Sequence, residues 1–191
     1  LSSFQNDFIH SNWWIIPAIQ KRMNKKISGD ENISYEEYIT KKYLSHTGGK
    51  VLISIGCGTG SHEIKLASLN PHLHIKGYDL SEALLQEARD KVVKADVKNI
   101  SFIKADAYAL LFADESVDYF LFNASLHHLQ HIDSFLQNKI VPALKENGLV
   151  ILNEYAGPNR MNFPASQIKE SSSLLNYLPD EKKKIAFTGI M

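Results

Sequence analysis

The 191-residue chain has one cysteine, no net charge and no long apolar run. A lone Cys57 excludes an internal disulfide, which is typical of a reducing compartment, so we expect a cytoplasmic protein. No apolar run reaches about 18 residues, so we expect no membrane span. Lys and Arg number 21, as do Asp and Glu, and this balance disfavours a nucleic-acid partner, which usually requires a basic excess or stripe.

Glycine and proline are also scarce, at 10 and 6 residues. These counts exclude a low-complexity or collagen-like chain. A chain of this length is the size of one domain, and it buries about 70% of its unfolded surface. The sequence therefore predicts a globular domain that needs no disulfide to hold its core.

Short apolar runs alternate with helical patterns between residues 47 and 155. The short apolar runs predict strands, and the apolar residues spaced three or four positions apart predict helices. The predicted strands cover 51–55, 72–78, 100–103, 117–122 and 149–152, and the helices cover 61–69, 81–95 and a stretch capped by Asp133. Strand–helix repeats predict a doubly wound, Rossmann-like α/β fold with a mostly parallel sheet of about five strands. Ligands bind beyond the carboxyl ends of such strands.

The two flanking segments differ from this core. Residues 1–46 contain only helical patterns, including a capping box that begins at Ser34, and they predict a helical cap on the sheet or a lid over the ligand. Residues 156–191 also predict helices and loops, and we interpret them as an acceptor-side segment. The 47–155 stretch is then the ligand-binding core.

A glycine loop joins the first predicted strand to the first helix, with glycines at 56, 58 and 60. Glycines allow a tight turn and let a ligand approach the backbone. The dinucleotide fingerprint G-x-G-x-x-G would require a glycine where Ser61 stands, and no Gly-Lys-Ser/Thr of a Walker loop follows. The spacing therefore favours another nucleotide-like ligand.

Acids follow the next two predicted strands. Asp79 ends the second strand, where a carboxylate can hold a ribose diol, although an acid there also suits a helix start. Asp106 ends the third strand, where it can accept a hydrogen bond from the exocyclic amine of adenine or form an Asx turn.

These residues in this order resemble the motifs of class I S-adenosylmethionine-dependent methyltransferases. The motifs that carry the resemblance are 51–60, 77–81, 105–107, 118–129 and 144–149. The resemblance implies a methyltransferase with S-adenosyl-L-methionine as cofactor. It implies that the methionine part lies over the glycine loop, the ribose at Asp79, and the sulfonium near Asn123. The implied cofactor-binding residues are Ser54, Gly56, Cys57, Gly58, Gly60, Asp79, Leu80, Asp106, Ala107 and Asn123.

One position departs from the family pattern. The family usually has an acid two residues before the first glycine, and here that position is Ser54. The acid would help to orient the amino group of the cofactor. A serine can still form hydrogen bonds, so we expect weaker or differently arranged binding.

The loop after the fourth strand bears on the methyl acceptor. It lacks the Asn/Asp-Pro-Pro-Tyr/Phe pattern of enzymes that methylate amide or nucleobase nitrogens. We therefore expect a small-molecule or glycan-precursor acceptor, methylated at oxygen, with His127 or His128 as general base. Alternatively, the two histidines only shape the pocket. Glu154 and Tyr155 are second-choice acceptor residues, and we assign no metal ligands.

Two other functions stay open: a non-catalytic S-adenosylmethionine-binding module and an NAD-dependent oxidoreductase. The flanks, with Trp13 and Trp14, resemble a subgroup associated with glycan biosynthesis. Family members usually add a sixth and a seventh strand, and none is predicted after residue 154. We therefore expect a truncated chain, or one whose edge strand a partner covers, with a homo-oligomer left open.

Overall fold

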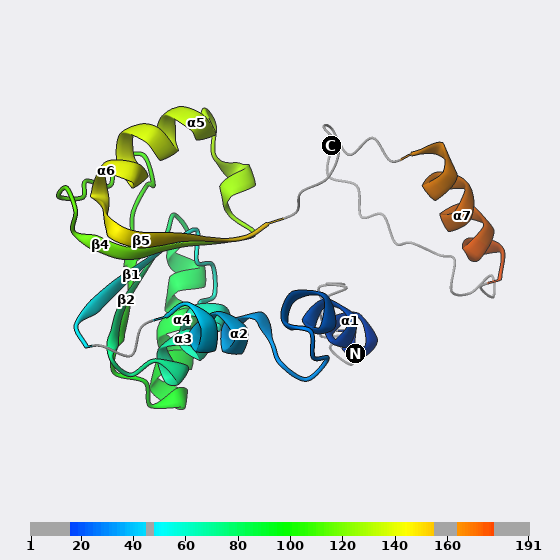
Figure 1. Ribbon diagram of the computed structural model, residues 1–191, viewed down its shortest axis with the longest axis horizontal. Helices are drawn as coiled ribbons and strands as arrows, with labels where there is room; N and C mark the ends of the chain where they lie inside the picture. Colours follow the sequence, from blue (N-terminus) through cyan, green and yellow to red (C-terminus); the bar gives the residue numbers. More distant parts are fainter. Residues whose placement is uncertain (1–15, 45–47, 155–163, 178–191) are drawn as a thin grey trace, which may run out of the picture. The chain divides into compact units, whose positions relative to one another are not determined.

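The computed structural model describes residues 16–44, 48–154 and 164–177 (Figure 1). The chain divides into two compact units, residues 1–154 and residues 155–191. The second unit contains helix α7 (Ala165–Asn176), in agreement with the helices and loops predicted over 156–191. No helix among the described residues combines the length and the apolar character needed to cross a membrane.

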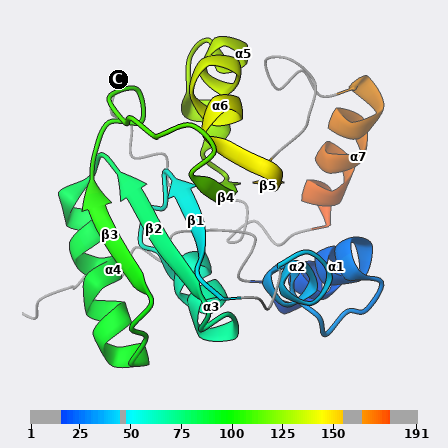
Figure 2. The same ribbon diagram turned by 60° about the vertical axis from the view of Figure 1, so that its left-hand side comes forward.

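The first unit is built on a five-stranded sheet. Its strands are β1 (Lys50–Ile55), β2 (Leu73–Asp79), β3 (Ile100–Lys104), β4 (Val117–Asn123) and β5 (Leu144–Asn153). They lie in the order β3-β2-β1-β4-β5, and every neighbouring pair is parallel (Figure 2). The predicted doubly wound, Rossmann-like sheet is confirmed. Its strand order reverses between β1 and β4, which is where such sheets bind ligands.

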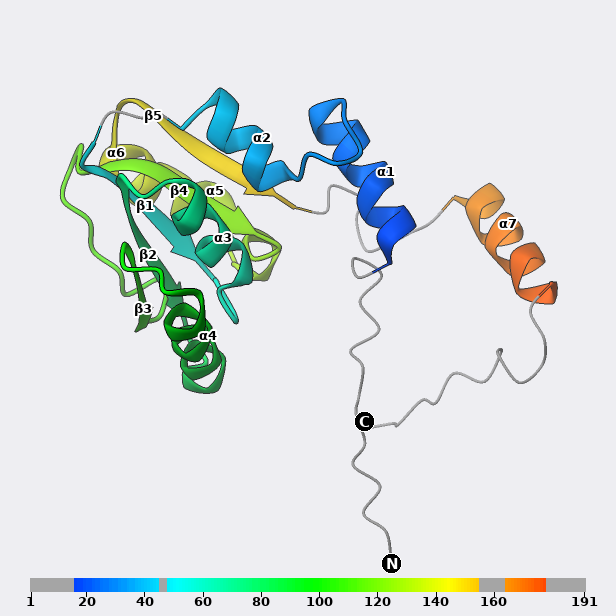
Figure 3. The same ribbon diagram turned by 90° about the horizontal axis from the view of Figure 1, so that it is seen from below.

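Helices cover both faces of the sheet. One layer contains α3 (Ser61–Leu69) and α4 (Glu82–Ala95), and the other contains α5 (Ile132–Phe135), the π-helical turn η3 (Leu136–Ile140) and α6 (Val141–Ala143) (Figures 1 and 3). Helix α2 (Tyr35–Lys42) packs against α3, and α1 (Pro17–Ser28) packs against α2. The N-terminal helices therefore belong to the α3 layer.

Alternation along the strands divides the core into two layers. Leu52 and Leu121 belong to the cluster packed with α3 and α4, whereas Ile53 and Phe120 belong to the cluster packed with α5 and η3. Because successive side chains of a strand point to opposite faces, Ser54 and Asn123 point toward the α3 layer. This alternation puts the polar strand ends of β1 and β4 on one face.

Two features differ from the prediction by more than one residue at the end of an element. Strand β5 begins at Leu144 rather than at Leu149, because Leu144 pairs with Val117 across a bulge in which Asn147 has φ +63°. Asp133 lies in the first turn of α5 and does not cap it; the N-cap position is His131, in the left-handed conformation at φ +50°.

The predicted N-terminal helices are present where the structure describes the chain. The Ser34–Glu37 capping box of α2 forms, with the Ser34 N–H donating to Glu37 Oε2 over 2.8 Å. α1 begins at Pro17, and Trp13 and Trp14 lie outside the described residues.

Candidate active site

The glycine loop is fixed between β1 and β2. The backbone N–H groups of Gly56 and Cys57 donate to the Tyr78 carbonyl oxygen over 2.8 Å and 3.1 Å. Gly56 has φ +73°, and a Cβ there would stand 2.6 Å from Ser125 Cβ, so this position requires glycine. A Cβ at Gly60 would overlap the ring of Phe102, because α3 starts directly over that ring.

Asp79 connects the glycine loop to the end of β2. Its Oδ2 accepts the Gly58 N–H over 2.8 Å, and its Oδ1 accepts the Ser81 N–H over 2.9 Å. Each carboxylate oxygen keeps a further lone pair, which suits it to the two hydroxyls of a ribose. A Cβ on Gly58 would meet nothing within 4 Å, so this side of the loop is open. These features fit the cofactor pose that the family motifs imply.

On the predicted adenine side, Asp106 forms the Asx turn that was one of its two predicted roles. Its Oδ1 accepts the Tyr108 N–H over 2.9 Å, which is an Asx turn. The side chain is exposed, as is Leu80 on the loop after β2 at 66%, and Ala107 is half-buried. Contact of these residues with adenine stays a prediction.

The predicted site residue Asn123, at the end of β4, has two polar partners that the sequence did not reveal, Tyr35 and Asn153. Asn123 Oδ1 accepts hydrogen bonds from the Tyr35 hydroxyl over 3.1 Å and from Asn153 Nδ2 over 2.6 Å. Burial, and then the charges of Glu36 and Glu63, raise the pKa of Tyr35, so its hydroxyl keeps its proton. Tyr35 comes from α2, and only the folded chain brings it to a strand end.

Ser54 does not stand alone at the position where the family has an acid. It is 1% exposed, and its Oγ donates to Glu63 Oε1 over 2.7 Å. Glu63, on α3, is also 1% exposed, and burial raises its pKa. One sign of this pair is visible in the sequence: Glu63 is the only acid in the predicted 61–69 helix.

The surroundings of the Cys57 thiol favour its neutral form. Burial, and then the charges of Glu63 and Asp79, raise its pKa, so the neutral thiol predominates. We therefore assign no nucleophile to the loop.

His127, in the turn after β4, and Glu154, directly after β5, form a dyad. Glu154 Oε2 lies 2.8 Å from His127 Nδ1, while Oε1 accepts the N–H groups of Ser125 and Leu126 over 2.7 Å each. The Ser125 hydroxyl donates to the Ile55 carbonyl oxygen over 2.6 Å, which ties this loop to the glycine loop. The structure thus joins His127 to the second-choice residue Glu154.

His128 lies beside this dyad. Its ring centroid is 4.1 Å from that of His127. Within residues 48–154, the carboxylate of Glu154 is bonded to His127 and not to His128. Of the two predicted histidines, His127 is therefore the one with an orienting acid.

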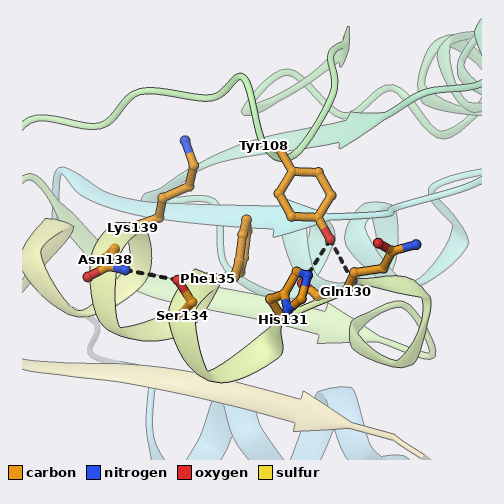
Figure 4. Close-up of a pocket in the computed structure, with 7 residues that line it drawn as sticks. All are labelled: Tyr108, Gln130, His131, Ser134, Phe135, Asn138 and Lys139. Carbon is orange, nitrogen blue, oxygen red and sulfur yellow. Dashed lines mark hydrogen bonds between the residues drawn. The ribbon is translucent and has the colours of Figure 1, made fainter.

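An open pocket of about 380 Å³ lies on the other layer, beside α5 (Figure 4). Its wall includes Tyr108, whose hydroxyl donates to the Gln130 carbonyl oxygen over 3.0 Å, and the side chains of Phe135 and Lys139. None of the residues lining it is a predicted site residue. The chemistry predicted from the sequence lies at the glycine loop instead.

Comparison with known proteins gives concordant results. A family model described as a methyltransferase domain matches residues 46–187. A demethylmenaquinone methyltransferase of Listeria monocytogenes is 27% identical over 160 residues, which cover 83% of this chain and 67% of the relative. The chain thus spans about two thirds of that protein.

Two solved structures share the fold. An S-adenosylmethionine-dependent methyltransferase of Aquifex aeolicus matches with a TM-score of 0.56 at 18% identity, covering 84% of this chain and 86% of that one. The YcgJ protein of Bacillus subtilis matches with a TM-score of 0.57 at 20% identity, covering 74% of this chain and 56% of that one. These results leave the oxidoreductase alternative without support. Because the family model covers most of the chain, this protein belongs to the methyltransferase-domain family, in the class I S-adenosylmethionine-dependent methyltransferases.

Proposed function

We propose that this chain holds S-adenosylmethionine at the glycine loop and methylates a small-molecule acceptor that must give up a proton to a base of the protein. The bound cofactor supplies an electrophilic methyl group on its sulfonium. The open side of Gly58, the Asp79 carboxylate and Asn123 would hold it. Because the methyl donor is already activated, the protein has to position the acceptor against the methyl group and to supply a base.

The His127–Glu154 dyad carries this proposal. Glu154 Oε2 accepts a hydrogen bond from the N–H at His127 Nδ1, which leaves the lone pair on Nε2 to take a proton from the acceptor. Glu154 is itself held by two backbone N–H groups, and the His127 side chain is 49% exposed, so a substrate can reach the ring. Dyads of this kind fix the tautomer and orientation of a catalytic histidine.

Two acceptor classes follow from different observations. The demethylmenaquinone methyltransferases that resemble this chain point to a quinone-type acceptor. The sequence motifs favour oxygen of a sugar or glycan precursor. Neither class is a nucleic acid, which agrees with the zero net charge of the chain.

Release of S-adenosylhomocysteine in the presence of demethylmenaquinol, the reduced and nucleophilic form of demethylmenaquinone, or of a panel of hydroxylated sugars tests the proposal. Removal of the base in His127→Gln should lower kcat about 10²- to 10⁴-fold on the active acceptor. Binding of S-adenosylhomocysteine, measured by calorimetry, should stay unchanged. His128→Gln is the matched control and should keep near-normal kcat.

Equal kcat for His127→Gln and the wild type would remove the base role. Tight cofactor binding without turnover on either acceptor class would favour the non-catalytic binding module.

A further inference from the structure

Among the described residues of the first unit, Glu63 has a buried carboxylate of which one oxygen has no hydrogen-bond partner. It is 1% exposed, and only its Oε1 is bonded, to the Ser54 hydroxyl. Its Oε2 is buried and has no hydrogen-bond partner among the described residues. A buried carboxylate oxygen without a donor costs free energy, so its retention calls for a partner that binds there.

Other buried acids of this unit have partners. Glu36 is bonded to His62 over 2.7 Å and lies 3.7 Å from Lys65 Nζ. Asp118 accepts the Val51 N–H and the Lys145 ammonium, each over 2.9 Å. Glu63 differs because the histidine beside it in sequence, His62, is already bonded to Glu36.

The surroundings of Glu63 face the proposed cofactor site. Ser54 lies on the α3 face of β1, one residue before the end of the strand and two residues before Gly56. The charge of Glu63 acts on the thiol of Cys57 in the glycine loop and on the hydroxyl of Tyr35, which is bonded to Asn123. The carboxylate is therefore close to the loop over which the methionine part of the donor is proposed to lie.

We propose that Glu63, held by Ser54, binds the α-ammonium group of the cofactor's methionine part and replaces the acid that the first motif lacks. This inference rests on the proposed function and adds a residue to its site. An ammonium carries three donors, so it can satisfy Oε2 and pair with the charge in one contact. Here the carboxylate comes from helix α3 instead of strand β1, and Ser54 leaves room for it and orients it.

Two ligands distinguish binding of the ammonium group from binding of the rest of the cofactor. S-adenosylhomocysteine has the amino-acid part, and 5′-methylthioadenosine lacks it. Glu63→Gln keeps the shape and can keep the bond to Ser54, so the unliganded protein should melt no lower than the wild type. Its Kd for S-adenosylhomocysteine should rise about tenfold to a hundredfold, while the Kd for methylthioadenosine changes less than about twofold.

A second variant and a control complete the calorimetric test. Ser54→Asp combined with Glu63→Gln returns the acid to the strand and should recover most of the lost affinity for S-adenosylhomocysteine. Glu36→Gln removes a carboxylate from α2 that is already paired, so it should not change the ratio of the two Kd values.

Three results would overturn the inference: unchanged S-adenosylhomocysteine affinity in Glu63→Gln, an equal loss of affinity for both ligands, or a lowered melting temperature that shows a purely structural role. Failure of the wild type to bind either ligand would instead contradict the proposed function, so the two failures are distinguishable.

Discussion

Gly56 and Gly58 lie two residues apart in one loop and are required for different reasons. Both have positive φ, +73° and +54°, which costs a residue with a Cβ about 1–2 kcal/mol. A Cβ at Gly56 would also collide with Ser125, whereas a Cβ at Gly58 would enter open space. Gly56 is therefore needed by the fold, and Gly58 by the proposed ligand.

Alanine at each position should separate these roles. Gly56→Ala should lower the free energy of unfolding by about 2–4 kcal/mol, since overpacking adds to the backbone strain. Gly58→Ala should cost only about 1 kcal/mol but should weaken S-adenosylhomocysteine binding at least about tenfold, because its methyl group fills the donor side. Urea unfolding and calorimetry measure the two effects.

Gly29→Ala is the matched control, since Gly29 also has positive φ and open space but ends α1. It should cost stability and leave ligand binding intact. Normal S-adenosylhomocysteine binding by Gly58→Ala would show that the open side of the loop does not face the cofactor.

At the scale of elements, α2 depends on α3. Eight residues are too few for a stable isolated helix, so α2 requires its cap and its contacts with α3. Glu36 and His62 form the central contact, over 2.7 Å. This attachment also fixes Tyr35, and through it Asn123, at the candidate site.

The Glu36–His62 pair should make stability depend on pH. Burial raises the pKa of Glu36, but the bond to His62 outweighs it and holds the pKa below the ordinary 4.5, so this stabilisation is present above pH 4.5 and is lost as pH falls through the lowered pKa. Burial lowers the pKa of His62, but Glu36 outweighs it and raises the pKa above 6.5, so this part is present below pH 6.5 and is lost as pH rises through the raised pKa.

The full contribution therefore falls between pH 4.5 and 6.5. It should be of the order of 1 kcal/mol, since solvent screens the half-exposed His62. The charges of Glu63 and Lys65 also affect the pKa of His62. The contribution of the pair is therefore measured as the difference in unfolding free energy between the wild type and Glu36→Gln across pH 4–9. A difference that does not vary with pH would contradict the pairing, and His62→Gln should remove the alkaline decline.

At the scale of the whole molecule, the chain has two compact units, and every residue proposed to hold the cofactor lies in the first. A chain that ends at Glu154 should therefore keep its melting temperature and bind S-adenosylhomocysteine within about threefold of the full chain. If residues 155–191 are the acceptor-side segment, this shorter chain should lose methyl transfer. Calorimetry and release of S-adenosylhomocysteine distinguish the two effects.

Lost cofactor binding in the shorter chain would show that the second unit contributes to the donor site. Retained turnover would contradict an acceptor-side role for residues 155–191.

The sequence alone indicated the strands of the sheet and the helices between them, because apolar runs and turn residues are local signals. It also indicated the glycine loop and Asp79, whose types and spacing are local properties of one strand–helix unit. It missed the start of β5, because pairing with β4 extends that strand through a bulge.

Only the tertiary structure brought distant residues together. Ser54 and Glu63 meet because α3 crosses back over β1, and Tyr35 reaches Asn123 because α2 docks on α3. Glu154 selects His127 because β4 and β5 are neighbours and end at the same edge. Periodicity within one segment cannot encode these contacts, because they depend on how separate elements pack. The sequence thus determined the fold and the donor loop, and packing decided which acids and which histidine complete the site.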